Sequence, residues 1–239
     1  MSDFSHYPAI PHPIAVQLPL LPEEPCPYLG GLRSQYRAFR SEAMAPRLYH
    51  QLMDAGFRRS GDVFYQPACR GCRQCVPLRV PVTSFTPSKS QRRIWRLNTD
   101  LQLTIDAPEA TEEKFALYRS YVESWHSRDA GSMEEFDRFL IQSPVSTLEF
   151  CYRDPSGRLL AVGICDICQD SLSSVYFYFD PEERRRSLGT FGAMAEISFA
   201  ASHGIPHYYL GYWIERCDAM CYKSRFRPFQ LLQTDGSWV

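Results

Sequence analysis

Residues 176–191 read YFYFDPEERRRSLGTF, and this stretch does most to predict the fold. Four consecutive aromatic residues are typical of a buried strand, and Asp180-Pro181 predicts where that strand ends. Residues 188–203 form an apolar segment followed by Gly204, so we expect a helix there. The unpaired amides of its first turn attract anions, and a glycine in that turn lets a ligand approach closely. We therefore expect an anion site formed by Arg184, Arg185, Arg186, Ser187, Leu188 and Gly189.

The segments around that stretch predict an α+β fold. Periodicity and capping residues favour helices at 111–126 and 132–140, and strands at 147–153, 159–167, 173–180 and 207–210. A small hairpin is expected around Asp235-Gly236. Helices, three meandering strands, a helix and a further strand follow this order in the acyl-CoA N-acyltransferase fold. We expect such a GNAT-like domain over residues 106–239.

Charge and proline content set the first 105 residues apart. The first 100 residues hold 13 lysines and arginines against 7 aspartates and glutamates, although the whole chain carries a net charge of −1. A locally basic segment attracts a polyanion. A helix is expected at 46–56, with strands at 57–66 and 76–85. We expect residues 1–25 to be a flexible lead-in and residues 26–105 a basic, cysteine-bearing region.

Composition also predicts the compartment. No apolar run approaches the roughly 20 residues that a membrane helix needs. The N-terminal residues lack the basic start and apolar stretch of a signal peptide. Nine cysteines, an odd number, do not indicate a disulfide framework. We expect a cytoplasmic protein with reduced cysteines and no membrane partner.

Three cysteines lie within seven residues, at Cys69, Cys72 and Cys75. The two overlapping CxxC spacings place three sulfurs on one loop, which suits tetrahedral zinc or an iron–sulfur cluster. Cys26 can supply a fourth ligand. The spacing does not distinguish zinc from iron–sulfur, and thiols that merely pack the loop are the alternative.

Two further segments combine cations with aromatic residues. Residues 88–96 read SKSQRRIWR, which suits phosphate contacts and base stacking, with Arg92 and Arg93 as the expected contacts. An exposed basic loop without a ligand is the alternative. Residues 210–228 alternate aromatic and cationic side chains and can place positive charge beside an acidic substrate. Its expected contacts are Tyr212, Tyr222, Lys223 and Arg225.

Together these motifs resemble the arginyl-tRNA–protein transferase family, and most closely its bacterial aspartate/glutamate leucyltransferase branch. The matching strings are CPYL at 26–29, GFRRSGDVFYQPACRGCRQCVPLRVPV at 56–82, SKSQRR at 88–93, YFYFDPEERRRSLGTF at 176–191 and YLGYWIERCDAMCYKSRFRP at 209–228. They span most of the chain in the family's order. Gly30 and Cys221 depart from the family's usual proline and asparagine.

The resemblance implies that leucine is transferred from leucyl-tRNA to proteins with an N-terminal aspartate or glutamate, which marks them for degradation by the N-degron pathway. An arginyl-tRNA donor is the alternative within the family. The resemblance also implies that the two arginine-bearing segments bind the tRNA donor. Family members have been proposed to bind an iron–sulfur cluster through cysteines that match Cys26, Cys69, Cys72 and Cys75 here.

Such a transfer is the attack of an α-amino group on an ester that is already activated, so neither ATP nor a cofactor is required. No Ser-His-Asp arrangement is evident, and we expect direct attack without an acyl-enzyme. Tyr178 and Asp180 are the expected groups for positioning the amine or taking its proton. An acetyl-CoA-dependent N-acetyltransferase would leave the basic N-terminal third without a use. A non-enzymatic RNA-binding zinc protein would leave the acyltransferase-like half idle.

Overall fold

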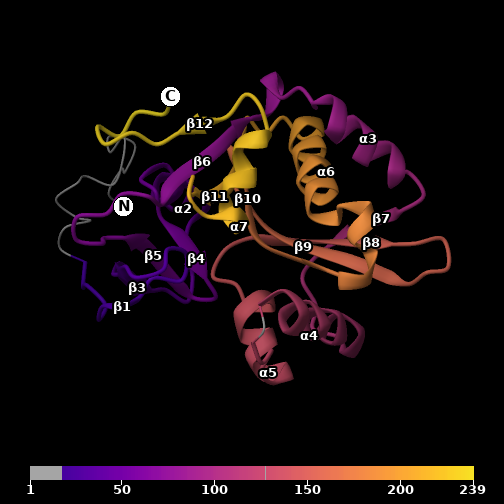
Figure 1. Cartoon of the computed structure of the whole chain (residues 1–239), viewed down its shortest axis with the longest axis horizontal. Coiled ribbons are helices and arrows are strands. Elements are labelled where there is room, and N and C mark those ends of the chain that lie inside the picture. Colours follow the sequence, from indigo (N-terminus) through magenta and orange to yellow (C-terminus); the bar gives the residue numbers. More distant parts are fainter. Residues whose placement is uncertain (1–17, 127) are drawn as a thin grey trace.

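The computed structural model describes residues 18–126 and 128–239 (Figure 1). Its strands are β1 (Glu24–Pro25), β2 (Arg33–Ser34), β3 (Tyr36–Arg40), β4 (Arg58–Ser60), β5 (Val63–Pro67), β6 (Val76–Pro81), β7 (Gln102–Asp106), β8 (Thr147–Arg153), β9 (Leu159–Ile167), β10 (Ser171–Phe179), β11 (His207–Trp213) and β12 (Gln230–Leu231). Its helices are α2 (Pro46–Asp54), α3 (Lys89–Leu97), α4 (Glu112–His126), α5 (Met133–Phe136), α6 (Leu188–Ser202) and α7 (Asp218–Cys221). Shorter helical turns are η2 (Val82–Ser84), η3 (Asp137–Ile141), η4 (Pro181–Arg186) and η5 (Tyr222–Arg225).

A seven-stranded sheet in the order β12-β6-β11-β10-β9-β8-β7 forms the centre of the molecule. Helices α3 and α6 cover one face, and α4 and α5 cover the other (Figure 1). Strands β8, β9 and β10 meander antiparallel, and β10 then pairs parallel with β11 across the α6 crossover. The predicted α+β, GNAT-like order of elements is confirmed.

Strand β10 shows how the aromatic stretch builds both layers of the core. Successive side chains of a strand point to opposite faces. Phe177 and Phe179 pack into the cluster that includes α6, whereas Tyr178 packs against Tyr118 and Phe136 of the opposite face. A run that is apolar at every position is therefore buried on both sides.

Strands β10 and β11 pair over only three residues. Their register runs from Ser171 opposite His207 to Ser173 opposite Tyr209. Beyond these pairs β10 bulges between Ser174 and Tyr176, and β11 bulges before Gly211, whose φ is +87°. The two strands therefore diverge in the middle of the sheet, and backbone groups on the facing edges must find other partners.

The N-terminal segment contributes strands to all three sheets, including a two-stranded one formed by β1 and β2. A three-stranded sheet, β3-β5-β4, lies beside the large one, and β6 and β7 are themselves strands of the large one. The division predicted between residues 105 and 106 stays a prediction, and the large sheet takes strands from both sides of it. Most of the predicted lead-in, residues 1–17, lies outside the described residues.

Several predicted elements differ from the structure. The strand expected at 57–66 is a hairpin, β4 and β5, which turns at Gly61 with a φ of +57°. The basic segment at 88–96, for which no helix was predicted, contains helix α3. Strand β7 is an exposed edge strand that the pattern did not predict. No helix among the described residues is long and apolar enough to cross a membrane.

A buried ion pair joins the N-terminal sheet to the large sheet. Arg59 of β4 donates from Nε to Asp166 of β9 at 2.6 Å, and both side chains are fully buried. Tyr49 and Thr147 donate to the same carboxylate at 2.7 and 2.8 Å. Four elements distant in sequence therefore converge on one charge, and that charge is fully hydrogen-bonded.

We expect Asp166→Ala to lower the free energy of unfolding by about 3–5 kcal/mol, because it leaves the Arg59 guanidinium buried without its counter-charge. Urea unfolding followed by circular dichroism measures the loss. Asp170→Ala removes an exposed carboxylate four residues away and serves as the control. Equal stability of the two variants would contradict a structural role for the ion pair.

Candidate functional site

The predicted anion loop lies between β10 and α6, as η4. Asp180 caps it by accepting a hydrogen bond from the Glu182 amide at 2.9 Å. Ser187 follows it with a φ of 53°, the one positive φ at a non-glycine among the described residues. Such a conformation is held only where the surrounding structure requires it. It turns the chain so that the first-turn amides of α6 lie beside the arginines.

The three arginines of this loop are not equivalent. Arg186 makes two hydrogen bonds of 2.9 Å to the carboxylate of Asp100, and its Nε is 3.2 Å from Glu183. It therefore anchors the loop to the turn before β7. Arg184 and Arg185 are exposed, and the Arg184 guanidinium lies 5.5 Å from the Trp125 ring centroid. Those two cations are the ones available to an anionic ligand.

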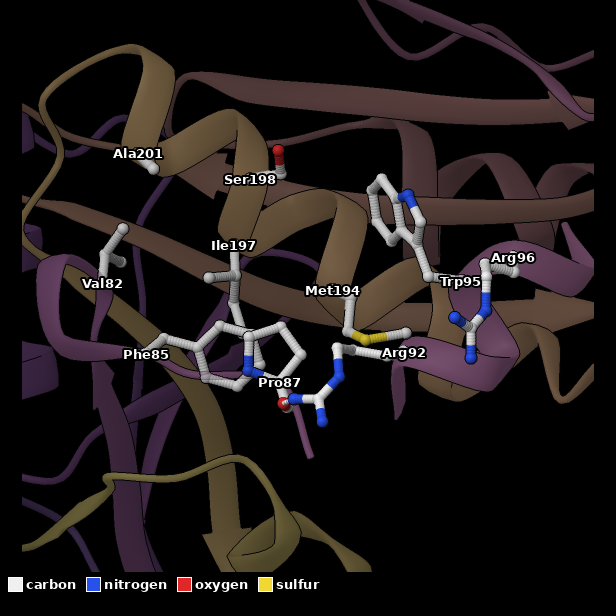
Figure 2. Close-up of a pocket in the computed structure, with 10 residues that line it drawn as sticks. All are labelled: Val82, Phe85, Pro87, Arg92, Trp95, Arg96, Met194, Ile197, Ser198 and Ala201. Atoms are coloured by element: carbon white, nitrogen blue, oxygen red, sulfur yellow. Dashed lines mark hydrogen bonds between the residues drawn. The ribbon is translucent and has the colours of Figure 1, made fainter. Parts of the chain in front are cut away.

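A groove of about 500 Å³ separates α3 from α6 (Figure 2). Arg92, Trp95 and Arg96 of α3 line it opposite Met194 and other side chains of α6. Trp95 is 39% exposed, and its ring centroid lies 5.2 Å from that of Phe191. An accessible indole on an apolar floor, with guanidinium groups beside it, has the composition of a surface that stacks a nucleobase and contacts phosphates.

Polar side chains hold α3 in place. Ser88 and Gln91 form a reciprocal capping box at its start. Gln91 also donates to the Arg225 carbonyl at 3.2 Å. Asn98, at its end, donates to the Arg186 carbonyl at 2.9 Å. The predicted tRNA contacts on α3 are therefore tied directly to the arginine loop and to the C-terminal segment.

Two buried cations lie where β10 and β11 diverge. Arg58 donates to the Ser173 hydroxyl at 2.8 Å and to the Ser174 carbonyl, on the β10 side. Lys223 donates to the Tyr212 carbonyl at 2.8 Å, on the β11 side. Burial, followed by the charge of Arg58, lowers the pKa of the Lys223 ammonium to about 7. Sequence reasoning identified Lys223 but missed Arg58.

The other residues predicted to contact the acceptor surround this position. Tyr212 is buried and donates to the Gly56 carbonyl at 2.9 Å. Burial raises the pKa of the half-buried Tyr222 to about 12, and Glu196 adds to the effect. Arg225 is exposed, and its carbonyl accepts a hydrogen bond from Gln91 of α3. The cluster predicted from residues 210–228 therefore packs against the diverging strands, while its roles stay predictions.

The predicted metal ligands lie near one another. The pKa of the Cys75 thiol is raised to about 12, mainly by burial. The neighbouring thiols of Cys69, Cys26 and Cys72 raise that pKa further. Cys217, which the sequence did not associate with this cluster, also raises the pKa of Cys75. Within the described ranges, no group of three or more His, Cys, Asp or Glu is arranged to hold a metal ion. The roles of Cys26, Cys69, Cys72 and Cys75 as ligands of zinc or of an iron–sulfur cluster stay a prediction.

The two predicted catalytic residues occupy structural positions. Tyr178 is fully buried among aromatic side chains beneath α4, and burial raises its pKa well above the usual range. Asp180 caps η4 and forms an ion pair with Arg158 at 3.1 Å. Capping accounts for Asp180 and packing for the Tyr178 ring, while the buried Tyr178 hydroxyl has no hydrogen-bond partner among the described residues. The catalytic roles of both residues stay predictions.

One buried carboxyl group was missed by sequence reasoning. Glu196 of α6 is fully buried, and the Tyr208 hydroxyl donates to it. Its Oε1 has no hydrogen-bond partner among the described residues, and a side chain at Gly163 would collide with it. Burial raises the pKa of Glu196 to about 7. A single glutamate in an otherwise apolar predicted helix was the sequence signal that could have identified this residue, because fully buried acids are rare.

Two family models match most of the chain. The model described as "Arginine-tRNA-protein transferase, N terminus" matches residues 24–93, and the model described as "Arginine-tRNA-protein transferase, C terminus" matches residues 113–233. The chain belongs to the arginine-tRNA-protein transferase family. The two matched segments contain the cysteine loop and the arginine loop, respectively.

Related proteins support the same family. A protein of Pseudomonas putida (strain W619) named aspartate/glutamate leucyltransferase is 42% identical, with 83% of this chain and 85% of the relative aligned. One of the same name from Hahella chejuensis is 36% identical over 91% and 94% of the two chains. Among solved structures, the C-terminal domain of a putative lysylphosphatidylglycerol synthetase from Agrobacterium fabrum matches with a TM-score of 0.51 at 14% identity. It covers 83% of this chain and 69% of that one, and the likeness concerns the fold alone.

Burial of Glu196 makes stability depend on pH. Because its folded-state pKa is raised above 4.5, the folded protein retains a proton that the unfolded chain loses. The favourable contribution is complete at low pH and is lost as pH rises through 7. We expect Glu196→Gln to remove a decline on the order of 2–3 kcal/mol between about pH 5 and pH 8.

Urea unfolding at the two pH values measures this decline. Glu215→Gln, at an exposed position, is the control and should keep the wild-type dependence. A Glu196→Gln variant whose stability still falls like that of the wild type would show that another group titrates.

Proposed function

We propose that this protein transfers leucine from leucyl-tRNA to the α-amino group of proteins that begin with aspartate or glutamate. Membership of the family supports a tRNA-dependent transfer, and relatives at about 40% identity are named for leucine and for these two acceptors. The observation that carries the proposal is the assembly of two arginine-bearing elements beside the diverging strands of an acyltransferase-like sheet. The product would be a protein marked for degradation by the N-degron pathway.

The donor would bind along α3 and the start of α6. The exposed guanidinium groups of Arg92, Arg184 and Arg185 supply charge for phosphates, and the first-turn amides of α6 add an anion site. Trp95 can stack a base of the single-stranded acceptor end. Because Asn98 joins α3 to the arginine loop, both elements can hold one tRNA in a fixed register.

The acceptor would enter where β10 and β11 separate. The reaction joins the amine nitrogen to the leucyl carbonyl carbon, breaks the ester bond to the ribose, and passes one amine proton to the leaving ribose oxygen or to solvent. The ester is already activated, so alignment of the two reactants supplies most of the required acceleration. No cofactor enters this balance, and the reaction belongs in the cytoplasm, where charged tRNA is found.

The donor specificity is tested by incubating the protein with tRNA charged with radiolabelled leucine, phenylalanine or arginine and a peptide that starts with Asp. We expect leucine to be incorporated fastest, because β10 and β11 carry apolar and aromatic side chains beyond the point where their pairing ends. Acetyl-CoA is included as a further donor and should give no product. Preference for arginine or for acetyl-CoA would overturn the proposal.

The tRNA surface is tested by the salt dependence of binding. We expect Arg92→Ala/Arg93→Ala to reduce the slope of log K against log salt by roughly 0.7–0.9 for each lost phosphate contact. Fluorescence anisotropy of labelled leucyl-tRNA at several salt concentrations measures the slope. Arg119→Ala/Arg138→Ala removes two exposed arginines from the opposite, α4–α5 face, and should leave it unchanged. Equal slopes for both double variants would mean that α3 carries no tRNA contact.

A further inference from the structure

Four cationic side chains are buried in the described part of the chain, and they fall into two classes. Arg59 is paired with Asp166, and Lys114 with Glu149. Arg58 and Lys223 are 9% and 8% exposed, and neither has a carboxylate within 4.0 Å among the described residues. Burying a cation without a counter-charge is costly. An anion bound between the two groups would offset this cost, and it would favour the charged form of Lys223, whose pKa is lowered by burial and by Arg58.

The backbone is shaped to bring the two cations together. A β-carbon placed on Gly211 would lie 3.5 Å from the Arg58 Nε and 3.5 Å from the Lys223 Nζ. The two nitrogens are therefore separated by at most twice that distance, and the glycine leaves the space beside them free of a side chain. Each cation donates to a carbonyl of a different diverging strand, at Ser174 and Tyr212. One cation is thus bonded to each of the two strands at the point where their pairing ends.

We propose that Arg58 and Lys223 together bind the side-chain carboxylate of the acceptor's N-terminal aspartate or glutamate. The inference rests on the proposed function, because it assigns that function's acceptor specificity to two residues. A carboxylate between the two groups would neutralise a buried charge that no aspartate or glutamate of the described residues approaches within 4.0 Å. An uncharged side chain in the same place would leave both cations unpaired, which is how a site rejects an isosteric neutral ligand.

Exposure favours a small carboxylate over a tRNA phosphate. The cations assigned to tRNA, such as Arg92 and Arg185, are exposed, as contacts to a continuous phosphate backbone require. Arg58 and Lys223 are nearly enclosed, and the tyrosines Tyr65 and Tyr212 lie next to Arg58. Such an enclosed position suits one small carboxylate rather than the continuous backbone of a polynucleotide.

The test measures binding rather than transfer. Isothermal titration compares two peptides that differ only in an N-terminal Asp or Asn. We expect the wild-type protein to prefer Asp, and Lys223→Met to weaken Asp-peptide binding roughly 100-fold. Binding of the Asn peptide and of leucyl-tRNA should stay within about twofold. Arg58→Met should act in the same way, and Arg58→Lys should retain most of the preference because it keeps the charge.

A matched control and a stability measurement separate recognition from folding. Arg216→Met removes an exposed cation from the same segment and should keep the Asp preference. Methionine keeps most of the lysine's volume but leaves the Tyr212 carbonyl without its donor, so we expect at most a small fall in the melting temperature of Lys223→Met. A lower melting temperature together with an intact Asp preference would show that Lys223 only caps a strand, and would overturn the inference.

Two further outcomes are decisive. A wild-type protein that binds both peptides equally would overturn the inference even if leucine transfer occurs. Weaker leucyl-tRNA binding in Lys223→Met with an unchanged Asp preference would overturn it too, and would assign the cations to the donor. Conversely, an Asp preference that depends on both cations would support it even if the donor proved to carry arginine, in which case only the proposed donor specificity fails.

Discussion

The divergence of β10 from β11 is the constraint on which the rest of the site depends. Their parallel pairing ends after Ser173 and Tyr209, so each strand presents an edge of backbone groups inside a covered sheet. Such groups must be hydrogen-bonded when they are away from water. The chain meets part of that need with Arg58 and Lys223, which also introduces two positive charges at the opening. The geometry of the sheet and the chemistry of the site thus have one origin.

This constraint explains why the N-terminal segment cannot be an independent appendage. Strand β4 carries Arg58 to β10 and the adjacent Arg59 to Asp166, so one short strand serves both the site and the scaffold. Strand β6 pairs with β11 along its full length, and α3 is bonded to the arginine loop through Asn98. Both family-matched segments are therefore needed to enclose the site, and the charge asymmetry of the first 100 residues serves a surface shared with α6.

Sequence reasoning succeeded where the signal is local. Strand Leu159–Ile167 and the helix ended by Gly204 follow from periodicity, a turn and a stop residue. It failed at α3, whose polar composition resembles a loop, although the capping box at Ser88 was available. It also failed to distinguish Arg58 from Arg59, because two adjacent arginines differ only in the residues that the folded chain places beside them. Residues such as Cys217 and Glu196 join their clusters through contacts that no spacing predicts.

The exposure of each cation, rather than its charge alone, determines which kind of anion it can bind. The arginines of α3 and η4 lie at the surface, where water screens their charge and many weak phosphate contacts add together. Arg58 and Lys223 lie at the diverging strands, where little water reaches them. There each charge is strongly stabilised by a single anionic partner and is strongly destabilised without one. A donor that is a large polyanion and an acceptor defined by one carboxylate require those two environments. A chain with a net charge of only −1 can provide both because its fold separates them.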